Sequence, residues 1–347
     1  MHPQAKPSGH LGRRGVLKTT LAALAAAAAA PIRARAAQSL TLYSGQHAQT
    51  VAMLTRRFTR ETGIAVGVHS GDGPEIANQI IAEGARSPSD VFFTENSPEL
   101  VLLAEKGLLA PIDAATLARI PRRYSSPNGE WVGVLARENV LAYNPALIGQ
   151  SALPASLLDL AGPEWKRKIA IAPTDSDFLP LVDAVAVVKG REAALAWLKG
   201  LRRNAALYQD DEGVVAAVNR GAVAAGIINS YYWARLRVET GAEKMRSRLY
   251  HFPPGDVGAL VNISGAGVLK SARHAEAAQR FLGFLVSPSV QEMLAKSDID
   301  FEYPLAPGVA ANPLLKPFSE LRPPDISVAT LGDDRLAGKL LREAGLI

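Results

Sequence analysis

Four side chains in this sequence have the chemical types and the positions that a ferric-ion site needs. Tyr231 and Tyr232 are adjacent, His47 follows a predicted first strand, and Glu95 follows another predicted strand. Fe(III) is a hard cation that prefers anionic oxygen donors, so two phenolates, a carboxylate and an imidazole make a plausible shell. The three anionic groups together would cancel the charge of the ion. These residue types therefore predict a ferric-ion site.

Each of these residues also has an ordinary explanation when it is taken alone. His47 could be a loop histidine with a polar role, and Glu95 could be a helix cap or a solvated carboxylate. The aromatic run Tyr231-Tyr232-Trp233 could simply pack in the core or on the surface. Only their joint placement after strands favours the metal site over these alternatives.

The chain contains no cysteine. Disulfides, zinc-thiolate sites, cysteine-ligated iron–sulfur clusters and a cysteine nucleophile are therefore excluded. The acylated cysteine of a bacterial lipoprotein is excluded for the same reason.

Residues 1–36 resemble a cleaved twin-arginine export signal. The pair Arg13-Arg14 precedes an alanine-rich apolar run that ends at Ala30, and Ala34-Arg35-Ala36 supplies small residues for cleavage after Ala36. The alternative is a membrane anchor, but the run is mostly alanine, is interrupted by Pro31 and is shorter than the roughly 20 residues a span needs. We therefore expect export to the periplasm.

Removal of this segment changes the electrostatic properties of the chain. The full sequence has a formal charge of +5, and the segment holds six basic and no acidic residues, so the charge of the remainder is 5 − 6 = −1. A weakly acidic protein gives no reason to expect nucleic acid or an anionic membrane surface as a partner. About 310 residues remain, enough for two lobes of ordinary domain size.

Short apolar strands alternate with amphipathic helices from the start of this mature part. Strands are expected at 40–43, 64–68 and 90–93, and helices at 50–62, 74–85 and from about residue 98. The alternation resumes with a strand at 169–171, helices near 179–188, 192–201 and 214–219, and a strand at 226–228. This pattern predicts an α/β fold with mostly parallel sheets in two lobes.

Two further extended stretches could connect the lobes. Residues 131–143 are rich in β-forming residues, and residues 259–268 form another extended stretch. We expect both to cross between the lobes as hinge strands, because no low-complexity linker separates two independent domains.

Ligands of parallel sheets bind beyond the carboxyl ends of the strands, where the candidate ligands occur. His47 and Glu95 would approach from one lobe and the tyrosines from the other, so closure would complete the shell and exclude water. Adjacent residues on a strand point to opposite faces, whereas in the first turn of a helix they diverge by only about 100°. Asn229 or Ser230 as a helix cap supports this helical placement of Tyr231 and Tyr232.

Several motifs together resemble the periplasmic ferric-ion-binding proteins of ABC importers. The resemblance covers nearly the whole mature chain. The main motifs are Tyr43-Ser44-Gly45-Gln46-His47, the run 86–92, Glu95 and Asn229-Ser230-Tyr231-Tyr232-Trp233. Further support comes from Trp165-Lys166, Pro173-Thr174, Ser264-Gly265-Ala266 and the run 302–305.

The resemblance implies a two-lobed periplasmic solute-binding protein fold with two hinge-crossing strands. It places residues 37–137 and 262–312 in an N-terminal lobe, and residues 138–261 and 313–347 in a C-terminal lobe. It also implies a monomer that binds Fe(III) through His47, Glu95, Tyr231 and Tyr232, often with a synergistic anion, and delivers it to the permease of an ABC importer.

The residues around the expected anion partly match the family and partly depart from it. Asn229 matches a family asparagine near the anion, and Asn96 stands where a polar amide neighbour is common. The loop with Asp175, Ser176 and Asp177 has two carboxylates where small neutral residues are expected, and Asp211 replaces an expected asparagine. Because carboxylates repel anions, we expect Asp175 or Asp177 to replace the anion, directly or through water.

Two other functions remain open. A solute-binding protein for an organic solute or an oxyanion would need an arginine or a nest of backbone amides in the cleft. A metal-dependent enzyme could use Asp175, Asp177 and Asp211 as acid, base or ligands, but no nucleophile elbow, phosphate loop or paired-histidine zinc motif supports catalysis. We therefore expect a binding protein rather than an enzyme.

Overall fold

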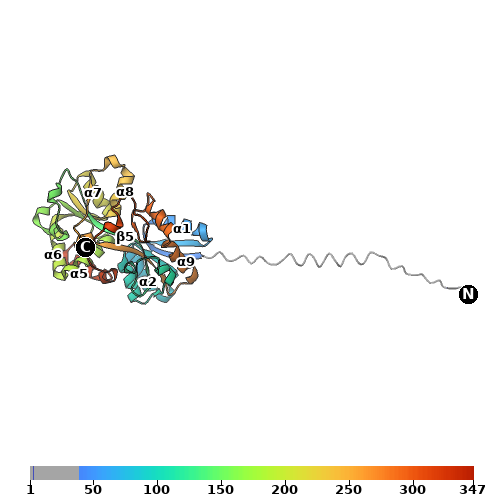
Figure 1. Cartoon of the computed structure of the whole chain (residues 1–347). Helices are drawn as coiled ribbons and strands as arrows, with labels where there is room; N and C mark the ends of the chain where they lie inside the picture. The colour runs from blue at the N-terminus through green and yellow to red at the C-terminus, as the bar shows by residue number, and fades with distance from the viewer. Residues whose placement is uncertain (1–2, 4–38) are drawn as a thin grey trace. The chain divides into compact units, whose positions relative to one another are not determined.

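The structure is a computed structural model that describes Pro3 and residues 39–347 (Figure 1). The predicted export signal, with its apolar run and cleavage position, lies outside the described residues except for Pro3. The described fold begins at residue 39 and ends at residue 347.

The first part of the chain folds as the alternation predicts. Its elements are β1 (Ser39–Gly45), α1 (Ala48–Thr62), β2 (Ala65–Ser70), α2 (Gly73–Glu83), β3 (Val91–Thr94) and α3 (Ser97–Glu105). Helix α1 buries one apolar side and ends at Gly63, whose left-handed backbone (φ 73°) suits glycine. Strand β1 pairs in parallel with both β2 and β3, so the βαβαβα prediction is confirmed.

The long strand β5 (Val132–Tyr143) joins the two halves of the sheet. It is buried along its whole length and pairs with β10 (Val261–Leu269) as far as Glu138. From Asn139 onward it pairs instead with β8 (Ala225–Asn229). Figure 1 shows β5 between the part that carries α1, α2 and α9 and the part that carries α5 to α8. The change of partner falls next to the expected lobe boundary at residue 137, although the full set of boundaries stays a prediction.

The second half repeats the α/β alternation. Its elements are β6 (Ile169–Ile171), α5 (Leu179–Lys189), α6 (Arg191–Asn204), β7 (Ala205–Leu207), α7 (Asp211–Arg220), β8, α8 (Ser230–Thr240) and β9 (Arg248–Tyr250). Strand β6 pairs in parallel with β7 and β8. The sheet order is β2-β1-β3-β10-β5-β8-β6-β7, with β4 (Leu109–Ala110), β9 and β11 (Tyr303–Pro304) attached beside this path.

The remaining α-helices pack on the sheet or on other helices that cover it. They are α4 (Ala114–Leu117), α9 (Ala275–Leu285), α10 (Pro288–Ala295) and α11 (Arg335–Ala344). The last of these packs against α5 and α6, so the end of the chain belongs to the second half.

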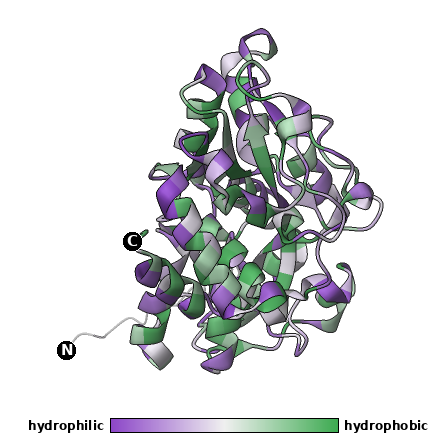
Figure 2. Cartoon of the chain, turned by 90° about the vertical axis from the view of Figure 1, so that its left-hand side faces the viewer, coloured by the Kyte–Doolittle hydropathy of each residue, from purple (hydrophilic) through white to green (hydrophobic). Residues whose placement is uncertain are grey.

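Buried apolar side chains form two clusters. One fills the first half and extends to Tyr231 and Tyr232, and the other lies among α5, α6 and α11. Figure 2 shows green, hydrophobic segments on the enclosed strands and purple, hydrophilic segments on the outer helices and turns. Among residues 39–347 no helix has both the length and the apolar character that crossing a bilayer requires.

Candidate metal centre

His47 and Glu95 emerge at the same edge of the first sheet. His47 immediately precedes α1, and Glu95 lies between the end of β3 and the start of α3. Gly45 at the end of β1 lies opposite Thr94 at the end of β3 in a parallel pair, so the following residues are neighbours. The Nδ1 atom of His47 is 3.0 Å from Oε1 of Glu95, and both side chains are mostly buried.

The two tyrosines reach this pair from the second half. Helix α8 begins at Ser230, so Tyr231 and Tyr232 occupy its first turn, as predicted. Their ring centroids are 4.1 Å apart. The His47 ring centroid lies 5.1 Å from that of Tyr231 and 6.2 Å from that of Tyr232. The structure therefore brings all four expected ligands into one cluster between the halves.

The cap of α8 differs in detail from the expectation. Asn229 occupies the N-cap position, but its side chain makes no capping hydrogen bond. Its Oδ1 atom and the Ser230 hydroxyl are both buried without a hydrogen-bond partner among the described residues. The helix start is thus fixed by the preceding strand and by burial of the tyrosines rather than by a side-chain cap.

In the part of the chain that the structure describes, histidine and carboxylate side chains alone do not make a metal site. Among residues 39–347 no group of three or more His, Asp or Glu side chains is arranged to hold an ion. The His47–Glu95 pair becomes a four-donor set only when the phenols are included. A metal bound here would therefore be one that accepts phenolate ligands, which favours Fe(III).

Asp177 lies at the centre of the contacts between the two halves. Its Oδ2 atom accepts a hydrogen bond from the Tyr231 hydroxyl at 2.8 Å. Its Oδ1 atom accepts one from Nδ2 of Asn96 at 3.3 Å and is 3.1 Å from Nη2 of Arg137. Burial raises the pKa of Asp177, but the charge of Arg137 and the Tyr231 hydrogen bond outweigh it and lower that pKa below its ordinary value. Asp177 is therefore a carboxylate held charged beside a phenol.

Arg137 is a buried residue that the sequence analysis missed. It is fully buried on β5, and its Nη1 atom is 3.4 Å from Oε1 of Glu302. Its Nη2 atom also donates to Oδ1 of Asn96. One guanidinium therefore contacts residues on both sides of the site. The available signal was the polar run Arg137-Glu138-Asn139 inside an otherwise largely apolar strand.

Gln46 connects this network to His47. Its Nε2 atom donates to the Ser264 hydroxyl at 2.6 Å and to Oε1 of Glu302 at 3.4 Å. Its Oε1 atom accepts from the backbone N–H of His47 at 2.7 Å. Burial, together with the charge of Asp300, raises the pKa of Glu302 to about 8. Gln46 and Glu302 were not identified as site residues from the sequence.

The acidic loop, residues 175–177, and the nearby Asp211 use carboxylates to accept hydrogen bonds from backbone amides. Asp175 Oδ1 accepts from the N–H of Asp177, and Oδ2 accepts from the N–H of Asp211, both at 3.0 Å. Asp211 Oδ2 accepts from the N–H of Asn229 at 2.9 Å. These amides could otherwise grip an exogenous anion. Burial and the charge of Asp177 raise the pKa of Asp175 to about 7, and burial and neighbouring carboxylates raise that of Asp211 well above its ordinary value.

Ser176 is placed differently from its two acidic neighbours. It lies close to Asp72, which immediately precedes α2 in the first half, and its influence partly offsets the rise that burial causes in the pKa of Asp72. Ser176 is therefore part of the contact between the halves.

The phenols are protonated in the absence of a metal. Burial, followed by the charge of Asp177, raises the pKa of both Tyr231 and Tyr232 well above the ordinary value. Burial opposes the protonated form of His47, but the Glu95 charge raises the His47 pKa to about 8. The Arg235 guanidinium lies 5.5 Å and 5.6 Å from the two tyrosine ring centroids. At these distances the cation is attracted to the electron-rich faces of the rings.

Comparisons with known proteins identify relatives that are named for ferric-ion binding. The chain is 41% identical over 314 residues to the Fe(3+)-binding periplasmic protein of Serratia marcescens, covering 90% of this chain and 92% of that one. It is 37% identical over 333 residues to the major ferric iron-binding protein of Neisseria meningitidis serogroup B, covering 95% and 100%. Iron-bound HitA from Pseudomonas aeruginosa has a similar structure, with a TM-score of 0.85, 43% identity and coverage of 89% and 99%.

The solved ferric-binding structures share the two-lobed α/β architecture, which confirms the predicted fold class. The family profile described as bacterial extracellular solute-binding protein matches residues 86–324. The chain belongs to this family of bacterial extracellular solute-binding proteins.

Proposed function

We propose that this protein captures Fe(III) between its lobes and carries it as cargo. The observation that supports this most directly is the convergence of His47, Glu95 and the adjacent Tyr231 and Tyr232 from three separate segments onto one buried cluster. Relatives named for ferric-ion binding match over most of the chain. In this proposal the imidazole, the carboxylate and both phenolates bind the ion.

We further propose that Asp177 takes the place of a synergistic anion. Its Oδ2 atom already contacts the Tyr231 hydroxyl, so it lies next to a proposed ligand oxygen. Two phenolates, Glu95 and Asp177 would give four negative charges, which Fe(III) and the buried Arg137 would balance. Asp175 and Asp211 have the different role of binding loop amides, which leaves those amides unable to hold phosphate.

The proposed capture is coupled to proton release. Both phenols must lose their protons when they bind the ion, because only phenolate supplies the anionic oxygen. The Tyr231–Asp177 hydrogen bond would break or shift as the ion replaces the proton. Iron affinity is therefore expected to fall in acid, and equal affinity at acidic and neutral pH would contradict phenolate ligation.

The wider cellular role is also a proposal. We infer that the protein is exported by a cleaved twin-arginine signal, works as a monomer in the periplasm, and delivers Fe(III) to the permease of an ABC importer. The family membership and the relatives named as periplasmic proteins support this location and a role in binding rather than catalysis.

The rival organic-solute function has one feature in its favour, since Arg137 is an arginine at the cleft. Its guanidinium, however, contacts Asp177, Glu302 and Asn96, and the nearby loop amides are bonded to carboxylates. An incoming oxyanion would have to displace these carboxylates. The arrangement therefore favours a cation.

A visible-absorption titration tests the proposed function. Metal-stripped mature protein titrated with ferric citrate should develop a phenolate-to-iron charge-transfer band that saturates near one equivalent. Tyr231→Phe and Tyr232→Phe should each weaken or shift the band. A folded protein that shows no band would exclude the proposed ferric site and leave the organic-solute function as the better explanation.

A further inference from the structure

A large cavity lies beside the start of the hinge strand β10, and its lining does not overlap the candidate metal centre. Its volume is about 1490 Å³, and its lining includes the start of β10, Pro304 of β11 and the segment 305–327 that covers them. None of the four proposed metal ligands lines it. Small-molecule sites usually measure roughly 300–1,000 Å³, so the space is sufficient for one such ligand and water.

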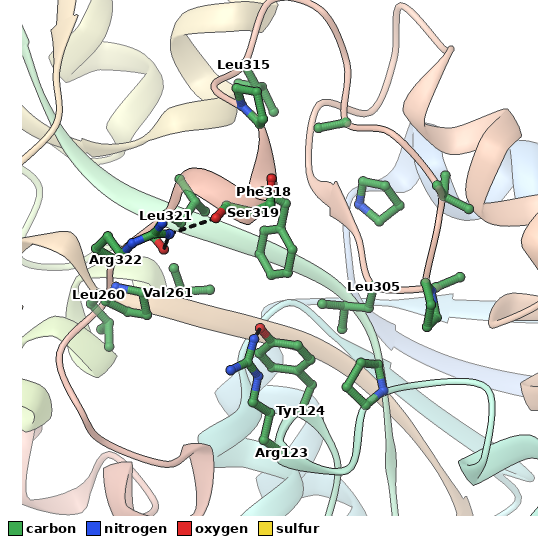
Figure 3. A pocket seen from close by; sticks show the side chains of 18 of the residues that line it. Arg123, Tyr124, Leu260, Val261, Leu305, Leu315, Phe318, Ser319, Leu321 and Arg322 are labelled. Carbon is green, nitrogen blue, oxygen red and sulfur yellow. Dashed lines mark hydrogen bonds between the residues drawn. The ribbon is translucent and has the colours of Figure 1, made fainter. Parts of the chain in front are cut away.

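The walls of this hinge cavity are rigid and partly aromatic. The Tyr124 ring centroid is 5.7 Å from that of Phe318, which is 5.4 Å from that of Tyr303. Figure 3 shows Tyr124 and Phe318 approaching each other from opposite sides of the cavity. Proline fixes the backbone φ angle, and eight prolines line the cavity: Pro121, Pro254, Pro304, Pro307, Pro313, Pro317, Pro323 and Pro324. A flat apolar group would therefore meet preformed walls.

Two arginines give one side of the cavity a positive charge. Arg123 lies over the Tyr124 ring at 4.6 Å, and Figure 3 shows its guanidinium beside the Tyr124 hydroxyl. Arg322 donates from Nη1 to the carbonyl oxygens of Ser319 and Leu321 at 2.7 Å and 2.9 Å. Neither guanidinium forms an ion pair with a carboxylate among the described residues. Asp325 is the one acidic side chain in the lining, which leaves a net charge of 2 − 1 = +1.

We propose that the hinge cavity binds a small organic anion with a flat aromatic body. The aromatic rings would pack against the body, and the guanidiniums would form charge-assisted hydrogen bonds to its carboxylate or sulfonate. The inference does not depend on the ferric site, because the two sites have different residues and opposite charge preferences.

The test uses two fluorescent probes that share one aromatic body. Anilinonaphthalene sulfonate carries the anionic group, and N-phenylnaphthylamine lacks it. Iron-free mature protein should bind one sulfonate probe per chain with a saturable rise in fluorescence, and should bind the neutral probe at least about tenfold more weakly, as expected for loss of a charge-assisted hydrogen bond. Absence of saturation, or equal binding of both probes, would overturn the proposal.

Variants that remove either a positive or a negative charge from the lining test whether the probe binds in this cavity. Arg322→Gln and Arg123→Gln should each weaken sulfonate binding, whereas Asp325→Asn should leave it equal or tighter. Ala311→Phe should reduce binding by filling the space. Arg203→Gln, an exposed change on α6 outside the lining, is the matched control. Circular dichroism should show every variant folded, and unchanged binding in both lining-arginine variants would place the probe elsewhere and refute the site.

Discussion

The two sides of the candidate metal centre are built in different ways. On the first side His47 and Glu95 already form a contact of 3.0 Å, and both side chains keep some exposure to solvent. On the second side Tyr231 is fully buried and bonded to Asp177, which Arg137 holds charged. The first side has to release only the His47 proton, whereas the second must release two phenol protons and reorganise a buried network. Selectivity for a highly charged ion is therefore expected to come mainly from the tyrosine side.

Removing both phenols should have the largest effect on iron binding. In the double variant Tyr231→Phe/Tyr232→Phe two anionic donors are lost, so the charge-transfer band should disappear. The loss of affinity should exceed the roughly ten- to hundredfold typical of outer-shell residues. Competition with a ferric chelator measures it, and Tyr208→Phe is the matched control outside the cluster. If the double variant bound iron with native affinity, the main contribution to iron affinity would have to come from His47 and Glu95.

Arg137→Met should destabilise the iron-free protein strongly. The substitution leaves Asp177 and Glu302 buried beside a neutral side chain, and breaking such a pair costs about 3–5 kcal/mol. Urea unfolding of the variant and of Arg60→Met, an exposed change on α1, gives the comparison. A loss no larger than that of the control would mean that the second side does not depend on this buried charge.

Asp177→Asn should distinguish a carboxylate that binds iron from one that only holds the acidic loop. If Asp177 replaces an anion, the amide should lower iron affinity by about ten- to hundredfold, and added phosphate should restore part of the loss. Asp175→Asn removes an acceptor of two loop amides and should instead change affinity less and thermal stability more. Identical behaviour of both variants would contradict the distinct roles proposed for the two carboxylates.

Of these substitutions, His47→Gln should have the smallest effect, and it should change how the free energy of unfolding depends on pH. The folded pKa of His47 is raised from 6.5 to about 8, so its contribution is complete below the unfolded pKa and is lost as pH rises through about 8. The shift corresponds to about 2 kcal/mol. Urea unfolding of iron-free protein between acidic and alkaline pH should show this decline in wild type and a flatter curve in His47→Gln. His69→Gln, at an exposed histidine that contacts Gln79, should retain the wild-type curve.

Much of the fold and the proximity of the four candidate ligands could be predicted because local patterns determine them. Apolar periodicity places α1, and the rule that ligands lie beyond strand ends brings His47, Glu95 and the tyrosines together. The partners of Arg137 could not be predicted in this way. Glu302 is 165 positions away, and only the pairing of β11 and β5 brings it alongside.

The orientation of side chains within the acidic loop also could not be predicted from the sequence. Its composition predicts a changed anion site, but it does not tell which carboxylate oxygen accepts from an amide and which from a phenol. In the structure Asp175 contacts amides and Asp177 contacts Tyr231, a difference that depends on the turn at Ser176–Phe178. The hinge cavity likewise depends on how the segment 305–327 covers the strands.

The position of β10 has a consequence for how the protein is made. This strand lies between β3 and β5 in the sheet, although it comes more than a hundred residues later in the chain. The first lobe therefore cannot complete its sheet during synthesis until residue 269 has left the ribosome. Pairings of such high contact order form slowly, and an incomplete sheet exposes unpaired edges. The nascent chain would thus depend on chaperones until most of its length is available, and its two lobes would mature together rather than in succession.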